Sequence, residues 1–154
     1  TRCLDMTSLL QLNTTFDVIW AEGSAYIIGV ERALEAWRPL LRPGGALVLS
    51  DMVWRTSQPS DAVQAFWASE YPAMTTVSER VKQAERAGYR VMSHIDMGQS
   101  ALDAYYLPLE ARVNDVRDRM AGHRALADLE RELNAYHQCE GQFGYEMFVL
   151  LSQL

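Results

Sequence analysis

The strongest constraint on the fold is a continuous apolar run at residues 46–50, Ala-Leu-Val-Leu-Ser, directly after Pro43-Gly44-Gly45. A short apolar run with no polar alternation is typical of a strand that is buried on both faces, as in parallel sheets. A chain with such a strand must also supply the helices that cover it. The run therefore favours a layered α/β architecture.

The segment before this run supplies a second strand and a helix. Residues 16–21, Phe-Asp-Val-Ile-Trp-Ala, are rich in strand formers, and Ser24 is placed to cap a helix after the turn at Glu22-Gly23. Pro43-Gly44-Gly45 should end that helix. Its predicted buried stripe repeats at intervals of three and four and consists of Ile27, Val30, Leu34, Trp37 and Leu41.

Further helices and strands follow in alternation after a loop predicted at residues 51–58. One helix begins at Ser60 and ends before Pro72, and the next begins with the capping box Thr76–Glu79 and ends at Gly88. A half-buried strand is predicted over 89–95 and a final apolar strand over 145–151. Between them, residues 103–140 carry two amphipathic helices, with Pro108 in the first turn of the first helix, separated by Gly122 and paired as a hairpin. The order indicates one α/β domain.

Composition and charge exclude several classes of function. A net charge of −6 among 154 residues argues against a nucleic-acid partner, and no apolar run approaches the ~20 residues needed to cross a membrane. Cys3 and Cys139 lack metal or redox spacing, so we expect two free thiols and a cytoplasmic protein. The three histidines, His94, His123 and His137, show no metal-ligand spacing, so no metal site is expected.

Several motifs, in this order and at these intervals, resemble class I S-adenosylmethionine-dependent methyltransferases, and among them the type 11 small-molecule group. They are Leu4-Asp5-Met6, residues 16–23 (FDVIWAEG), residues 40–47 (LLRPGGAL) and Ala87-Gly88-Tyr89. The resemblance implies a partial Rossmann-like sheet with the family's strand order 4-5-7-6. It also implies that residues 1–154 are the C-terminal part of one methyltransferase domain, with residues 103–140 as a helical substrate-cover insertion.

The family's glycine-rich loop is missing from this sequence, which contains no GxGxG. In the family that loop approaches the methionine and ribose parts of the cofactor. The resemblance thus implies that S-adenosyl-L-methionine is the cofactor, and that this chain supplies only one wall of its site. We expect the chain alone to be inactive and to bind the cofactor weakly or not at all.

The resemblance places five residues at the cofactor. Asp5 matches a carboxylate that accepts from the adenine amino group, with the Met6 backbone at the ring edge. For Asp5 the alternative is a turn residue. Trp20, Ala21 and Glu22 end their strand, where ligands of open α/β sheets gather. Glu22 is a candidate catalytic base, and the alternative is a carboxylate stabilised at a helix N-terminus.

Four aromatic residues are candidates for the substrate pocket, because aromatic faces attract the sulfonium of the cofactor. They are Tyr26, Trp54, Tyr105 and Tyr106. Their alternative role is in the core, which the helical spacing favours for Tyr106. The charged runs Arg117-Asp118-Arg119 and Glu130-Arg131-Glu132 are interpreted as solvated helix faces.

The sequence leaves more than one function open. The first hypothesis is methyl transfer to a small-molecule acceptor by the full-length parent enzyme. The alternatives are a non-catalytic methyltransferase-like binding or assembly module, and another doubly wound nucleotide-binding fold. In the family's sheet order the strand at 16–21 loses its neighbour, so the resemblance implies an exposed apolar edge, which favours homodimerisation or sheet extension through that edge.

Overall fold

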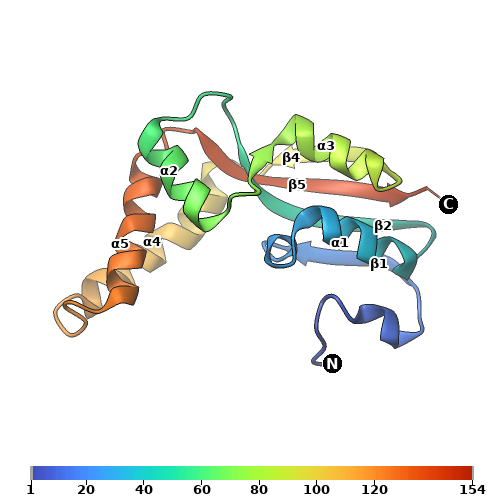
Figure 1. Ribbon diagram of the computed structural model, residues 1–154, viewed down its shortest axis with the longest axis horizontal. Coiled ribbons are helices and arrows are strands. Elements are labelled where there is room, and N and C mark those ends of the chain that lie inside the picture. Colours follow the sequence, from blue (N-terminus) through green and yellow to red (C-terminus); the bar gives the residue numbers. More distant parts are fainter. Residues whose placement is uncertain (1, 154) are drawn as a thin grey trace.

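The strands form one open sheet in the order β1-β2-β5-β4 in the computed structural model, which describes residues 2–153 (Figure 1). β1 is parallel to β2, and β5 is antiparallel to both β2 and β4. This order confirms the predicted 4-5-7-6 half-sheet with β1 at its edge. The strands are β1 (Phe16–Glu22), β2 (Leu41–Trp54), the short β3 (Thr75–Thr76) beside the end of β2, β4 (Tyr89–Asp96) and β5 (Phe143–Ser152).

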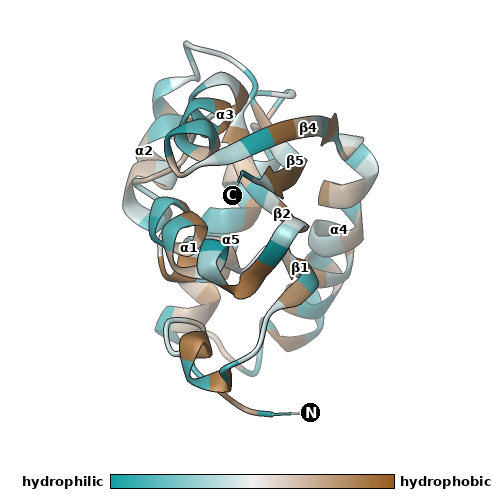
Figure 2. Cartoon of the chain, turned by 90° about the vertical axis from the view of Figure 1, so that its right-hand side faces the viewer, coloured by the Kyte–Doolittle hydropathy of each residue, from teal (hydrophilic) through white to brown (hydrophobic). Residues whose placement is uncertain are grey.

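The helices lie in two groups around this sheet. Figures 1 and 2 show α1 and α3 over one face of the strands, whereas α4 and α5 form a hairpin that extends from the far end. The hairpin predicted within 103–140 is therefore present. The helices are α1 (Val30–Trp37), α2 (Asp61–Glu70), α3 (Val77–Arg86), α4 (Gly98–Val116) and α5 (Arg124–His137), with 3-10 turns η1 (Leu9–Leu12), η2 (Ala25–Ile27) and η3 (Arg38–Leu40).

The predicted start of the first helix is wrong. Gly29 has φ +85°, a conformation that interrupts a helix, and α1 begins only after it. Ser24 makes no side-chain cap hydrogen bond, and Ile27 in the preceding 3-10 turn is 63% exposed. By contrast, Thr76 caps α3 as predicted, because its hydroxyl accepts from the Glu79 amide at 3.3 Å.

The predicted ends of three other elements are also wrong. Residues 51–54, expected in a loop, continue β2 because β3 and β5 pair with them, and Asp51 is buried. β5 begins at Phe143, since Gly144 joins the ladder opposite Val53. α4 begins at Gly98, so Pro108 lies inside the helix rather than in its first turn.

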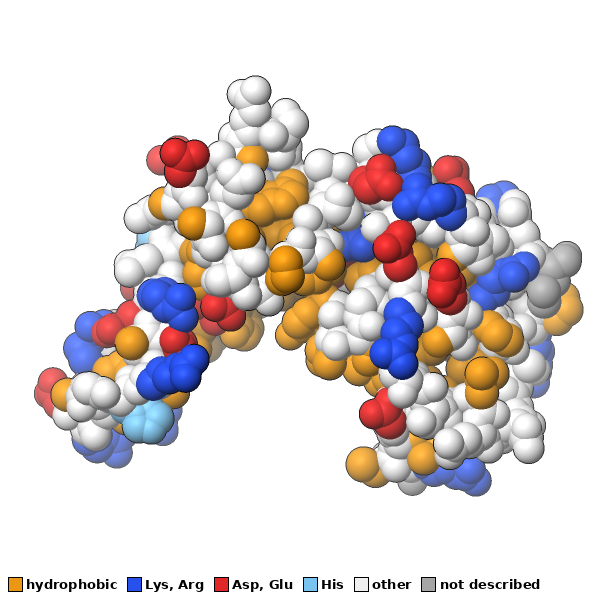
Figure 3. Space-filling model, viewed as in Figure 1, with side chains coloured by type: hydrophobic (Ala, Val, Ile, Leu, Met, Phe, Trp, Pro, Cys, Tyr) orange, Lys and Arg blue, Asp and Glu red, His pale blue; other side chains and the backbone are white. Residues whose placement is uncertain are grey.

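Two apolar clusters stabilise opposite ends of the molecule. The first joins α1 and α3 to the sheet through Leu34, Leu49 and Phe148, and the Tyr89 hydroxyl donates to the Leu34 carbonyl at 2.9 Å. The second joins α2, α4 and α5 around Phe143. Between the helical hairpin and the sheet the surface is hollowed and apolar (Figure 3).

The sheet face opposite α1 and α3 is apolar and much less covered. Trp20 on β1 is 61% exposed, and the register aligns it with Val48 on β2 and Val149 on β5. Val18 on the same strand is 51% exposed. An apolar face of this kind joined to an open edge favours the addition of further polypeptide.

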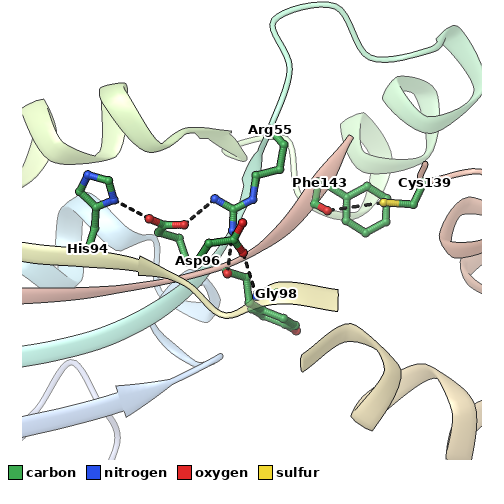
Figure 4. A network of polar contacts seen from close by, with 8 residues as sticks. Arg55, His94, Asp96, Gly98, Cys139 and Phe143 are labelled. Carbon is green, nitrogen blue, oxygen red and sulfur yellow. Dashed lines mark hydrogen bonds and ion pairs between the residues drawn. The ribbon is translucent and has the colours of Figure 1, made fainter. Parts of the chain in front are cut away.

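An ionic network around the buried Glu146 carboxylate fixes the start of the hairpin to the sheet. Arg55, just after β2, pairs with Glu146 on β5 and, at 2.6 Å, with Asp96 at the end of β4 (Figure 4). Glu146 is 2% exposed and also contacts His94 Nδ1 at 2.5 Å. Asp96 accepts from the Gly98 amide at 2.8 Å, so the network reaches the first residue of α4.

We predict that Arg55→Met destabilises the protein by about 3–5 kcal/mol, since it leaves the buried Glu146 carboxylate without its arginine. Arg42→Met is the matched control, because Arg42 pairs with Asp17 in an exposed bridge at 2.7 Å and its loss should cost at most about 1 kcal/mol. Urea unfolding of the three proteins measures both free energies. Equal effects of the two substitutions would contradict the structural role given to Arg55.

Candidate functional site

A cavity of about 450 Å³ lies at the corner between the sheet, α2 and the α4–α5 hairpin. It opens where β1 and β2, which are parallel, end, and this is the edge at which open α/β sheets bind ligands. Its lining is mainly aromatic with three carboxylates, and consists of Gly23, Tyr26, Asp51, Met52, Phe66, Trp67, Glu70, Tyr71, Tyr105, Tyr106, Glu132 and Tyr145.

The wall formed by β2 holds a buried ion pair. Asp51 and Arg80 are 2% and 3% exposed, and their side chains approach to 2.7 Å. The Tyr71 hydroxyl donates to the Asp51 carboxylate at 3.0 Å and accepts from Arg80 at 3.0 Å. Burial raises the pKa of Asp51, while Arg80 and Tyr71 oppose that shift by favouring the carboxylate. Burial also raises the pKa of Tyr71.

Sequence reasoning misses this cluster because the pattern of residues 51–58 predicts a loop. A usable signal is present: Asp51 directly follows the buried run 46–50, so it stands near the carboxyl end of a parallel strand. Its partner Arg80 lies on α3 and Tyr71 follows α2, and nothing in their spacing predicts that they meet.

The wall formed by the hairpin holds a second carboxylate, Glu132. It lies on α5 and lines the cavity, so its interpretation as part of a solvated helix face is wrong. Burial raises the pKa of Glu132, and the nearby Tyr105 and Tyr106 hydroxyls partly offset this. Burial, with Glu132 nearby, raises the pKa of Tyr105 to about 12.

Three of the four predicted pocket aromatics line the cavity. Tyr26 comes from η2, and Tyr105 and Tyr106 come from α4. Tyr106 also fits its alternative role, since it is fully buried and its ring stacks on Tyr136 with centroids 4.2 Å apart. Trp54 is outside the lining and packs against the second apolar cluster, because β2 continues through residue 54.

The predicted cofactor residues at the end of β1 lie beside the cavity but outside its lining. The Trp20 indole nitrogen donates to the Glu22 carboxylate at 2.6 Å, and Ala21 is buried in the first cluster. The next residue, Gly23, does line the cavity, and its amide donates to the Ser50 hydroxyl at 3.0 Å. This hydrogen bond joins the end of β1 to β2 beside the cavity.

Asp5 and Met6 lie in the segment before η1, outside the cavity lining. The Asp5 carboxylate accepts from the Thr7 amide at 2.7 Å, and hydrogen bonds from Thr7 lower its pKa. This is the geometry of the turn interpretation. The Met6 carbonyl accepts from the Trp37 indole at 3.1 Å, so this segment is attached to α1. The adenine contact stays a prediction.

Residues 2–153 contain no group of three or more potential metal ligands. None of the helices within that range is long and apolar enough to cross a membrane. Cys3 and Cys139 are both free thiols, as expected.

Comparisons with solved structures identify the fold. No family model matches the sequence, and no curated protein matches it significantly. The [4+2]-cyclase SpnF has 22% identity and a TM-score of 0.72 over 99% of this chain and 55% of its own. YjhP from E. coli has 23% identity and a TM-score of 0.72 over 92% of this chain and 60% of its own.

A third similar structure is a SAM-dependent methyltransferase from Geobacter sulfurreducens in complex with S-adenosyl-L-homocysteine. It has 19% identity and a TM-score of 0.70 over 92% of this chain and 59% of its own. This chain thus spans somewhat more than half the length of these three solved chains. With its half-sheet β1-β2-β5-β4 and its flanking helices, the chain has the fold of class I SAM-dependent methyltransferases.

Proposed function

We propose that this chain is the acceptor-binding part of an S-adenosyl-L-methionine-dependent methyltransferase that acts on a small molecule. The observation that carries the proposal is the aromatic cavity at the carboxyl ends of β1 and β2, closed on one side by the α4–α5 hairpin. Several proteins of similar fold were crystallised with S-adenosylmethionine or S-adenosylhomocysteine. One of them, from Haemonchus contortus, also contains phosphomonomethylethanolamine.

The residues present fit one side of such a cofactor. Gly23 follows β1, and a Cβ added to it would meet no atom within 4 Å, so the backbone there is open to a ligand. Trp20 and Asp5 are exposed. We assign Asp5, Met6, Trp20 and Ala21 to the cofactor and Glu22 to a general-base role. When bound, the cofactor supplies an activated methyl group.

The chain's own contribution to methyl transfer is positioning. Transfer from a sulfonium is an in-line displacement, so alignment of the acceptor and exclusion of water matter most. Tyr26, Tyr105 and Tyr106 are assigned to the acceptor pocket, with the hairpin, predicted as residues 103–140, as its cover. The fixed Asp51–Arg80 pair would keep the β2 wall rigid while ligands exchange.

The proposed enzyme includes polypeptide beyond this chain. The solved chain of SpnF is matched over only 55% of its length, and the 154 residues contain no glycine-rich cofactor loop. We propose that residues 1–154, of which 1 and 154 lie outside the described residues, form the C-terminal part of one domain. The open β1 edge would pair with the remaining part, or with a second copy when that part is absent.

A second candidate function is supported by one comparison. SpnF, a protein of similar fold, is a [4+2]-cyclase by its description, so the fold alone does not establish methyl transfer. A non-catalytic binding or assembly module is the other alternative. Both are distinguished from the main proposal by whether a methyl group leaves the cofactor.

We predict that the 154-residue chain binds S-adenosyl-L-methionine with a dissociation constant weaker than about 100 μM, which corresponds to roughly −5.5 kcal/mol. The parent protein, with its preceding segment, should bind more tightly and transfer labelled methyl groups to a pool of small acceptors. Titration calorimetry and radiolabel transfer measure the two results. Micromolar binding by the chain alone would contradict the proposal that it supplies only one side of the cofactor site. Tight binding of the cofactor by the parent protein without methyl transfer would favour the cyclase or the non-catalytic module.

We predict that Glu132→Gln raises the thermal midpoint at pH 8 but not at pH 4. Because burial raises the pKa of Glu132 in the folded state, ionisation destabilises the fold above that pKa, and protonation removes the cost at low pH. Each kcal/mol regained corresponds to roughly 2–4 °C in a domain of this size. Glu130→Gln, on the same helix and bridged to Arg117 at 2.6 Å, should show no such gain.

We predict that the chain self-associates through the β1 edge and that Val18→Lys prevents this, because a lysine on an edge strand opposes pairing. Leu107→Lys is the control, since Leu107 is a similarly exposed apolar residue on α4. Light scattering across a concentration series measures the mass. A monomer at all concentrations, or equal sensitivity to both substitutions, would exclude association through this edge.

A further inference from the structure

Not all of the carboxylates that line the cavity have an ion-pair partner. Its lining includes three carboxylates and no Lys, Arg or His. Asp51 is neutralised by Arg80 at 2.7 Å, and Glu70 lies 3.8 Å from Arg131 in an exposed pair. Glu132 forms no ion pair with any described residue, and the Tyr105 and Tyr106 hydroxyls lie near it. Glu132 is therefore the one carboxylate of the lining without an ion-pair partner among the described residues.

Aromatic rings from separate elements of the fold line the same cavity. Tyr26 and Tyr71 have centroids 5.5 Å apart, and Tyr105 and Tyr106 have centroids 4.9 Å apart. Tyr26 and Tyr105 are each about half exposed, so part of each ring is open to a ligand. Ring faces carry negative electrostatic potential and attract organic cations.

A buried donor beside the cavity also lacks a partner. Trp67 lines the cavity and is 8% exposed, and its indole nitrogen has no acceptor among the described residues. Buried N–H groups in proteins are nearly always satisfied. Trp67 is thus a polar residue of the cavity wall whose donor the fold leaves without a partner among the described residues.

We propose that the cavity binds acceptors that carry a cationic amine, with Glu132 as the ammonium ligand and the tyrosine rings as its walls. This assignment depends on the proposed function only in treating the ligand as the methyl acceptor. An anionic ligand would lie beside Glu132 and Glu70 without any cation in the lining, and a neutral one would leave Glu132 uncompensated. The charge pattern thus discriminates among ligands of the same size.

The test uses three probes of nearly equal shape that differ in charge: choline, 3,3-dimethylbutan-1-ol and 3,3-dimethylbutanoate. Titration of the 154-residue chain, followed by calorimetry and by tyrosine NMR shifts, should show choline binding at least about tenfold more tightly than the alcohol, with the anion weakest. Equal or tighter binding of the alcohol would overturn the proposal.

Two substitutions show which residues cause the preference for choline. Glu132→Gln should reduce choline affinity about tenfold and leave the alcohol unchanged, whereas the matched Glu130→Gln should change neither. Tyr105→Leu, at a half-exposed position, should also weaken choline selectively, and it tests the aromatic wall independently of Glu132. Identical behaviour of Glu132→Gln and Glu130→Gln would remove Glu132 from the site.

The outcome is separable from that of the proposed function. These titrations need no cofactor, so a choline preference can be measured even if the parent transfers no methyl group. If the parent protein transfers methyl groups but the chain shows no preference for choline, the proposal of a cationic acceptor is wrong and the methyltransferase proposal stands.

Discussion

The structure depends on the long antiparallel ladder between β2 and β5. It joins Ala46–Trp54 to Phe143–Leu151, segments almost a hundred residues apart in the chain. One end of the ladder supports the cluster beneath α1 and α3, and the other end supports the cluster of α2 and the hairpin. Because one strand pair spans both clusters, the cavity has a continuous floor even though its walls come from separate helices.

The strands and the helical hairpin are predictable from sequence because apolar periodicity reports burial directly. The strand order follows instead from the resemblance to class I methyltransferases. The site is less predictable. Residue type alone points to Tyr26, Tyr105 and Tyr106, but Asp51 resembles a loop residue because its counter-ion Arg80 is distant in sequence. Glu132 resembles its exposed neighbours because helix periodicity cannot show which part of a polar face meets another element.

Asp51 and Glu132 show two ways of burying a carboxylate. Asp51 has an arginine and a tyrosine hydroxyl, which make it part of the framework. Glu132 has no ion-pair partner among the described residues, and its burial raises its pKa, so ionisation of this carboxyl costs folding free energy. A carboxylate that lines a cavity without a counter-ion is a candidate binding group, since a ligand can provide the missing cation.

The placement of the hairpin has a consequence for how this molecule can diversify. β4 and β5 are antiparallel neighbours, so a short turn would connect them without changing the sheet. Instead, residues 97–142 make a long excursion that carries Tyr105, Tyr106 and Glu132. Three of the twelve residues that line the cavity thus come from one segment between two adjacent strands, so a change in that segment would alter ligand contacts without changing the order of the sheet.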